Sequence, residues 1–261
     1  MPFETLFLIN LGSLAGILLV LWLISIRIDN VNVVDVFWGL AFVTVSWLTL
    51  SVTGNWAAVP VGLTLLVSVW GIRLAGYLGW RSLGKPEDYR YAAMRERRGK
   101  SFRLMSLFTV FWLQGLIACF ISLPLQIGIK DGGAWTWQAS FGAAVWLVGF
   151  IFESVGDYQM ARFKADPANQ GKVMRQGLWR YTRHPNYFGD FLIWWGIYLA
   201  AAQPENWWWT IIGPVTMSYL LLKVSGVQLL ENSLRTRVDG YEEYVENTSS
   251  FFPLWTKNSR T

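Results

Sequence analysis

Charged residues are scarce in this chain of 261 residues. Asp, Glu, Lys and Arg make up 15% of it, against about a quarter in a typical soluble domain. Hydrophobic residues make up 53%, and they gather in runs long enough for a helix of about 20 residues to cross a hydrocarbon core of about 30 Å. This composition excludes an ordinary water-soluble domain and predicts a bundle of membrane-spanning helices.

Cysteine and histidine are almost absent, with Cys119 and His184 as the single copies. One cysteine excludes an intramolecular disulfide, and one residue of each kind is too few for a Cys/His zinc site. We therefore predict no metal site. The chain also lacks a predicted strand followed by Gly-x-Gly-x-x-Gly, which excludes a Rossmann nucleotide-binding domain. Linkers, low-complexity tracts and internal repeats are absent too, so we predict one integral membrane domain over residues 1–261.

Seven hydrophobic stretches are candidate membrane spans: 6–26, 33–53, 57–79, 103–125, 136–156, 187–202 and 207–227. The sixth is short, and Gly213-Pro214 interrupts the seventh. The first lacks the basic start and the cleavage site of a signal peptide, so we expect it to be retained. Within it, Gly12 and Gly16 have the spacing of a close helix contact. We expect an all-α bundle of seven transmembrane helices.

Basic residues lie on one side of this predicted bundle. If the N-terminus is outside, the outer segments contain one basic residue, Lys130, and the inner segments collect Arg27 and the basic residues of 81–100, 162–183 and 235–260. Cationic loops stay in the cytoplasm, so this pattern predicts an external N-terminus and a cytoplasmic C-terminus. The net charge of +5 then reflects topology and attraction to anionic membrane lipids rather than nucleic acid binding.

Three segments are expected on the cytoplasmic side: 81–103, 157–187 and 231–261. The first mixes arginines with Tyr89 and Tyr91. The second is long for a loop in a compact bundle, and long ordered loops are usually functional. Within it, we expect the fifth helix to continue from Asp157 and to end at Asp166-Pro167. Pro185 is placed to begin the sixth helix.

Cationic residues precede that sixth helix: Arg175, Arg180, Arg183 and His184. Arginine forks suit phosphate or carboxylate groups, and a helix N-terminus also favours anions. Asn186 and Asp190 share a helix face and offer an amide and a carboxylate to a ribose or a carboxamide. The spacing predicts a site for an anionic, hydrogen-bonding ligand. A positively charged cytoplasmic loop followed by a helix start explains it equally well.

The run Arg183-His184-Pro185-Asn186-Tyr187-Phe188-Gly189-Asp190, after Gly177-Leu178-Trp179 and before Trp194-Trp195-Gly196, resembles the signature of membrane steroid and sterol reductases. The resemblance extends over about residues 30–255 and is closest to the bacterial branch of the steroid 5α-reductase family. It implies a bacterial inner-membrane protein with seven helices and an NADPH site facing the cytoplasm. The cofactor contacts it implies are Asp157, Arg162, Arg175, Trp179, Tyr181, Arg183, His184, Asn186, Tyr187 and Asp190.

The same Arg-His-Pro core is also similar to membrane methyltransferases of the isoprenylcysteine carboxyl methyltransferase kind, which bind S-adenosylmethionine. The segments 231–234 and 240–244 resemble the endings of both families. There we expect Glu231, Asn232 and Arg235 to close over the nucleotide, although solvated charges beyond a membrane span would give the same sequence. Asn186 after the proline, and Gly-Asp three residues later, favour the reductases.

A reductase of this kind needs a proton donor, because hydride addition to a conjugated C=C bond leaves negative charge on the carbonyl oxygen. Ionisable residues inside spans are functional candidates. Arg73, Tyr77 and Arg81 recur every four residues and share one helix face. We predict Tyr77 as proton donor, Asp35 as its orienting partner, and Arg73 at the substrate or cofactor. A helix-start carboxylate and an interfacial tyrosine are the structural alternatives.

The animal steroid 5α-reductases use a glutamate on the second helix and a tyrosine on the third, and neither can be matched residue by residue here. The sequence therefore predicts NADPH-dependent reduction of an activated C=C bond in a lipophilic substrate from the bilayer, such as a 3-oxo-4-ene steroid or another enone lipid. The alternative is S-adenosylmethionine-dependent methylation of a lipid or prenylated acceptor. A transport or scaffold protein that binds no nucleotide is a third class.

Overall fold

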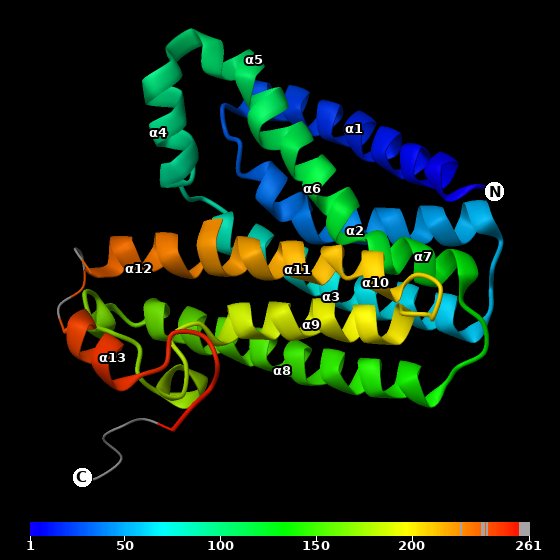
Figure 1. Ribbon diagram of the computed structural model, residues 1–261. Helices are drawn as coiled ribbons and strands as arrows, with labels where there is room; N and C mark the ends of the chain where they lie inside the picture. Colours follow the sequence, from blue (N-terminus) through cyan, green and yellow to red (C-terminus); the bar gives the residue numbers. More distant parts are fainter. Residues whose placement is uncertain (225, 236–237, 239, 256–261) are drawn as a thin grey trace. The chain divides into compact units, whose positions relative to one another are not determined.

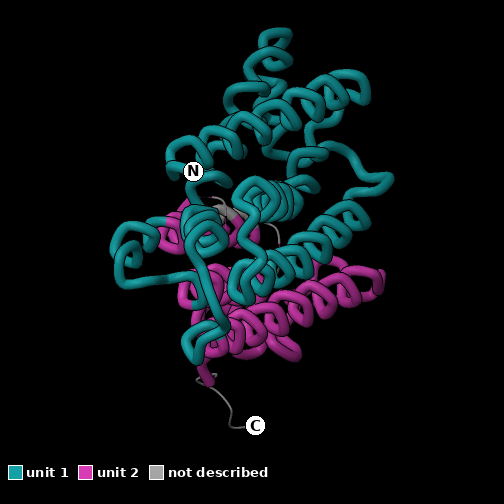
Figure 2. Tube along the Cα trace, turned by 90° about the vertical axis from the view of Figure 1, so that its right-hand side faces the viewer, with its two compact units in different colours: residues 1–139, 200–212 teal, residues 140–199, 213–261 magenta. Residues whose placement is uncertain are grey.

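A computed structural model describes residues 1–224, 226–235, 238 and 240–255 of the chain. The chain divides into two compact units (Figure 2), and the single membrane domain over residues 1–261 stays a prediction. Unit 1 contains Met1–Ala139 and Ala200–Ile212, and unit 2 contains Ser140–Leu199 and Gly213–Thr261.

The helices of unit 1 are α1 (Phe3–Ile28), α2 (Val33–Thr53), α3 (Ala58–Ser82), α4 (Tyr89–Arg98), the 3₁₀ turn η1 (Gly99–Ser101), α5 (Phe102–Ser106), the π-helical η2 (Leu107–Trp112), α6 (Leu113–Ile121), α7 (Leu123–Asp131) and α10 (Trp207–Thr210). Those of unit 2 are α8 (Trp137–Ala165), which begins in unit 1, the 3₁₀ turns η3 (Pro167–Asn169) and η4 (Gly177–Arg180), α9 (Pro185–Ala201), α11 (Ile212–Tyr219), the π-helical η5 (Leu220–Val224), α12 (Val227–Arg235) and α13 (Tyr241–Asn247). The described residues form no β-strand beyond one isolated bridge.

Five helical stretches of the described chain are long and apolar enough to cross a membrane: Phe3–Ile28, Val33–Thr53, Ala58–Ser82, Tyr89–Ile121 and Trp137–Ala165 (Figure 1). They confirm an all-helical protein and indicate an integral membrane protein. The sixth predicted span corresponds to α9, which has 17 residues, a little short of the usual 20. The seventh is divided among α10, α11 and η5. The count of seven spans and the orientation of the termini stay predictions.

Helices α2 and α3 touch through glycine. A Cβ atom built on Gly39 would lie 2.5 Å from the carbonyl oxygen of Gly71, and one on Gly71 would lie 2.5 Å from that of Gly39. Small residues permit such backbone contact in membrane proteins. The close contact predicted at Gly12 and Gly16 is wrong, since a Cβ on either meets no atom of the described chain within 4 Å. Both lie on the exposed side of α1.

A buried polar cluster links three helices of unit 1. The Asn10 amide nitrogen donates to Thr49 Oγ1 at 2.9 Å and to Gln126 Oε1 at 3.0 Å. Gln126 in turn donates to Ser122 Oγ at 2.9 Å, and all four side chains are fully buried. Interhelical hydrogen bonds of this kind stabilise membrane bundles. They join α1, α2 and the junction of α6 with α7. Helix α7 continues to Asp131, beyond the predicted end of the fourth span at residue 125.

The helix boundaries around the predicted cofactor segment are confirmed. Helix α8 runs to Ala165, and the Asp166 side chain caps η3 by accepting a hydrogen bond from the backbone nitrogen of Ala168. Helix α9 begins at Pro185. A Cβ atom on Gly189 would meet Glu153 and Gly149 of α8 at under 3 Å. The two helices that flank the segment therefore pack with their backbones in close contact.

Candidate functional site

A phenol and a carboxylate are joined near the start of α2 in unit 1. The Tyr91 hydroxyl donates to Asp35 Oδ1 at 2.6 Å, and it accepts a hydrogen bond from Gln114 Nε2 at 3.2 Å. Tyr91 is 6% exposed, and the Asp35 side chain is 29% exposed. Arg90 reaches the other Asp35 oxygen at 3.2 Å. The phenol is thus held by one donor and one acceptor, and a guanidinium balances the carboxylate.

The chain folds this way because the turn before α4 is tied to the turn between α1 and α2. Asp88 caps α4 through the backbone nitrogen of Arg90, and its own nitrogen donates to Asn32 Oδ1 at 2.8 Å. Arg95 forms two hydrogen bonds to Glu87, at 2.9 and 2.8 Å, and a third to Asp29 at 2.7 Å. These contacts fix the first turn of α4 over the start of α2.

Gln114, the second partner of the phenol, follows directly after a π-helical segment. Residues Leu107–Trp112 form η2, and α6 begins at Leu113. A π segment changes the helix register, and such segments are frequent at functional sites. The departure from α-helix thus sets the direction from which Gln114 reaches Tyr91.

Arg73, Tyr77 and Arg81 lie on one face of α3, as predicted. The guanidinium carbons of Arg73 and Arg81 each lie 5.7 Å from the centre of the Tyr77 ring. The catalytic roles of Tyr77, Asp35 and Arg73 stay predictions. What sequence reasoning missed is the phenol that contacts Asp35, namely Tyr91, although the mixture of arginine and tyrosine in segment 81–103 marked its surroundings.

A second cluster, in unit 2, is centred on Arg183. Its Nε donates to Glu231 Oε1 at 2.8 Å, and one terminal nitrogen donates to the carbonyl oxygens of Val245 and Thr248. The side chains of Arg183 and Glu231 are 7% and 12% exposed. This arginine therefore ties α12 and the C-terminal segment to the start of α9, instead of presenting its fork to solvent.

His184 shares the same carboxylate. Its Nε2 lies 3.1 Å from Glu231 Oε1, its ring stacks on Tyr187 with centroids 5.5 Å apart, and the residue is 1% exposed. Burial lowers the pKa of His184 below 6.5 despite the neighbouring carboxylate, so the ring is neutral at pH 7. Burial alone would raise the pKa of Glu231, but the hydrogen bonds from His184 and Arg183 and the guanidinium charge lower it to about 2.

The charge states assign the tautomer of His184. An ionised Glu231 only accepts, so Nε2 carries the proton and Nδ1 is a bare acceptor. Nδ1 is buried and has no hydrogen-bond partner in the described part of the chain. Buried polar atoms are almost always paired. A donor from a bound ligand would satisfy it.

The C-terminal segment doubles back over the loop before α9. The backbone nitrogen of Arg183 donates to the Ser249 carbonyl at 2.9 Å, and that of Leu254 donates to the Tyr181 carbonyl at 3.0 Å. The Tyr244 hydroxyl donates to the Trp179 carbonyl, and burial raises its pKa. Trp179 and Tyr181 are thereby engaged by the tail, which no local sequence signal indicated.

An acid of α8 and an amide of α9 are hydrogen-bonded to each other. Asn186 Nδ2 donates to Asp157 Oδ1 at 3.1 Å, and Asp157 is 5% exposed. Asp190 lies one turn further along α9 and is half-buried. Asp157 and Asn186 are thus brought together as a pair at the start of α9, as a shared site requires.

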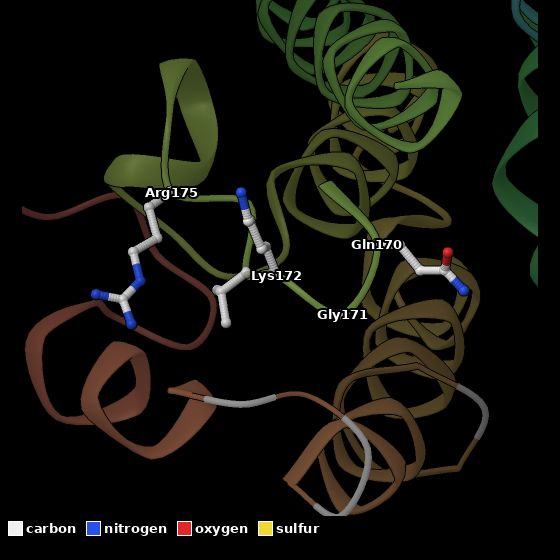
Figure 3. Close-up of a pocket in the computed structure, with 5 residues that line it drawn as sticks. Gln170, Gly171, Lys172 and Arg175 are labelled. Carbon is white, nitrogen blue, oxygen red and sulfur yellow. The ribbon is translucent and has the colours of Figure 1, made fainter. Parts of the chain in front are cut away.

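Two exposed cations, Lys172 and Arg175, line an open hollow of about 400 Å³ in the loop 170–175 (Figure 3). Arg175 pairs with Glu243 at 2.9 Å and bonds the Gly240 carbonyl at 2.7 Å. Arg162, Lys172 and Arg180 are exposed and form no ion pair with any described residue. Their charges are available to an anion, and the hollow lies within the size range of ligand pockets, roughly 300–1,000 Å³.

The structure thus brings some of the predicted cofactor residues together and leaves others apart. Arg183, His184 and Glu231 form one cluster, and Asp157 with Asn186 forms another. Arg235 pairs with Glu242 at 3.3 Å, and the side chain of Asn232 lies outside the described residues. In the described chain, no three His, Cys, Asp or Glu residues are arranged to hold a metal ion.

Comparison with known proteins gives a family and distant relatives with a named activity. Residues 21–248 match the family described as protein of unknown function DUF1295. An uncharacterized protein of Schizosaccharomyces pombe is 27% identical over 267 residues, which cover 90% of this chain and 76% of the relative. No solved structure matches the chain.

Two matches are shorter. The 3-oxo-5-alpha-steroid 4-dehydrogenase 1 of Bos taurus is 30% identical over 66 residues, which cover 25% of this chain and 26% of the relative. The enzyme of the same name from Rattus norvegicus is 31% identical over 86 residues, which cover 31% and 30%. The chain thus spans less than a third of these steroid enzymes. The match over most of its length shows that the chain belongs to the DUF1295 family.

Proposed function

We propose that the protein is an NADPH-dependent membrane reductase that saturates an activated C=C bond in a lipophilic enone such as a 3-oxo-4-ene steroid. The observation that carries this proposal is the part-buried hydrogen bond between Tyr91 and Asp35, which joins a phenol donor to α2, a helix long and apolar enough to cross a membrane. The partial similarity to steroid dehydrogenases supports the same chemistry.

Reduction of an enone adds a hydride to one carbon and a proton to its neighbour, while negative charge passes through the carbonyl oxygen. NADPH, when bound, supplies the hydride. The Tyr91 phenol turns its proton from Asp35 toward the substrate oxygen and stabilises that charge. Gln114 keeps the phenol oxygen in place by donating to it. Arg90 compensates the Asp35 carboxylate during this exchange.

The residues of unit 2 fit a dinucleotide by their donors and acceptors. The bare Nδ1 of His184 accepts from a carboxamide or a ribose hydroxyl, and Asn186 offers an amide beside it on the same turn. Lys172 and Arg180 provide charge for phosphate groups, and Arg162 adds a fork for a 2′-phosphate, which favours NADPH over NADH. Arg183 acts as a positioning residue because its guanidinium is already bonded to the tail.

The topology completes the proposal. The concentration of Lys and Arg in segments 81–103 and 157–187 supports a cytoplasmic cofactor end, seven spans and an external N-terminus. The Arg183–Asp190 signature supports membership of a bacterial branch, with the protein in the inner membrane. The substrate then enters from the bilayer, which suits a lipophilic enone.

Ligand-dependent thermal stability of the detergent-solubilised protein tests the cofactor, because a ligand that binds the folded state raises its apparent stability. We expect NADPH to raise the melting temperature, and Arg180→Gln to weaken this response. The matched control Arg97→Gln removes an exposed arginine of unit 1 and keeps the full response. A shift with S-adenosylmethionine or S-adenosylhomocysteine alone would replace the proposal by a methyltransferase. If none of these ligands raises the melting temperature, a transport or scaffold protein would be favoured.

A further inference from the structure

Helix α4 turns into α5 in unit 1 (Figure 1), and four cations lie along this turn in the sequence. Gly99 makes this turn with a φ of +53°, a conformation that favours glycine. The cations are all exposed, and they are Arg97, Arg98, Lys100 and Arg103. Their clustering follows from the bend, because it places the end of one helix against the start of the next.

None of these cations has an ion pair with a described carboxylate, in contrast to their neighbours on α4. Arg90 pairs with Asp35 and Asp88, and Arg95 pairs with Glu87 and Asp29. Two of the four side chains form local hydrogen bonds: Arg97 Nε donates to the Ala93 carbonyl at 3.3 Å, and Arg98 donates to Met105 Sδ at 3.0 Å. Glu96, the carboxylate beside Arg97, is exposed and forms no ion pair with any residue that the structure describes. The bend therefore carries a net positive charge.

Apolar surface begins directly beyond this charge on the same continuous helix. Leu104 is 60% exposed, Phe108 53% and Leu113 46%, in a stretch apolar enough to cross a membrane. A cationic cap above exposed aliphatic and aromatic side chains matches the two parts of a phospholipid, whose anionic headgroup lies above its acyl chains. A free phosphate would use the charge and leave the apolar surface unmatched.

We propose that the bend between α4 and α5 binds the headgroup of an anionic phospholipid, with Arg97, Arg98, Lys100 and Arg103 as its ligands. Helix α4, which ends at the bend, also carries Tyr91. The guanidinium carbon of Arg95 on α4 lies 4.9 Å from the centre of the Phe102 ring on α5, and this contact links the two helices. A lipid on the bend therefore steadies α4 and the phenol that it presents to Asp35. This effect on turnover rests on the proposed function, whereas the binding itself does not.

Native mass spectrometry of the full chain with phosphatidylglycerol or phosphatidylcholine tests the binding site. Each cation near a membrane surface contributes about 1 kcal/mol to attraction of anionic lipid, so Arg97→Gln with Lys100→Gln should weaken phosphatidylglycerol binding roughly 30-fold. The control double variant Arg27→Gln with Lys85→Gln removes the same charge from exposed cations elsewhere in unit 1. It should keep most of the affinity.

Equal losses in both double variants, or no loss at Arg97 and Lys100, would overturn the site. Displacement of phosphatidylglycerol by inorganic phosphate would overturn the lipid assignment in favour of a free-phosphate site. Hydrogen exchange of residues 89–106 gives a readout without turnover. We expect phosphatidylglycerol to slow it in the wild type and in the control variant, and to leave it unchanged in the Arg97/Lys100 variant.

Discussion

Replacing Glu231 by glutamine removes the charge at the centre of the unit 2 cluster while keeping its shape. Arg183, 7% exposed, would lose its carboxylate and keep only the carbonyl oxygens of the tail. Leaving a buried charge without its partner is strongly destabilising, typically by about 3–5 kcal/mol. The tail and α12 should detach from the start of α9 more easily.

The pKa of Glu231 gives an independent magnitude. It is lowered from 4.5 to about 2, and each tenfold change in proton affinity is worth about 1.4 kcal/mol, so the ionised carboxylate stabilises the fold by roughly 3 kcal/mol at pH 7. Burial opposes this lowering of the pKa, and the hydrogen bonds from His184 and Arg183, together with the charge of Arg183, produce it. A lowered pKa means that this contribution is complete above pH 4.5 and is lost as the pH falls toward about 2.

Thermal unfolding of the detergent-solubilised variants measures the effect. At about 2–4 °C per kcal/mol for chains of this size, Glu231→Gln should lower the melting temperature by roughly 6–12 °C. Glu243→Gln is the matched control, because its pair with Arg175 is exposed at 65% and 41% and such pairs contribute about 0–1 kcal/mol. Equal melting temperatures for the two variants would refute a stabilising role for the ion pair between Arg183 and Glu231.

Three further predictions concern the phenol, the histidine and the helix contact. Tyr91→Phe should lower kcat by roughly 100-fold and spare NADPH binding, as measured by steady-state kinetics. An unchanged kcat in this variant, with a lowered kcat in Tyr77→Phe, would make Tyr77 on α3 the proton donor. The chain has one histidine, so the unfolding free energy should fall as the pH drops below 6.5, where His184 takes up a proton in the unfolded chain and the buried ring does not. A His184→Asn variant should lack this dependence on pH. The same dependence in both proteins would contradict a buried, neutral His184. Gly39→Ala should cost about 1–3 kcal/mol by overpacking, whereas Gly12→Ala should cost nothing; similar unfolding curves for both would exclude the contact between α2 and α3.

Local signals in the sequence predicted the helices and several of their ends. The second span coincides with α2 at Val33–Thr53, because a continuous apolar run is bounded by Asn32 and Gly54. Asp166-Pro167 and Pro185 marked the segment between α8 and α9, since proline restricts the backbone on both of its sides. These features depend on neighbouring residues alone, and so one sequence suffices to find them.

Contacts between distant residues could not be predicted in this way. Tyr91 meets Asp35 across 56 residues, and Arg183 meets Glu231 across 48; the sequence marked all four as polar and could not pair them. The π segment at Leu107–Trp112 has no local signature, although it sets the direction of Gln114. The glycine contact was assigned to α1 because spacing alone does not say which face of a helix is buried.

Isotope transfer tests the central claim most directly. The purified protein in lipid nanodiscs would be incubated with a 3-oxo-4-ene steroid and NADPH carrying deuterium at the transferred position, and the product examined by mass spectrometry. We expect a saturated ketone that has gained one deuterium, and a large loss of this product with Tyr91→Phe. A methylated product formed from labelled S-adenosylmethionine, with no deuterium transfer to any enone lipid offered, would contradict it.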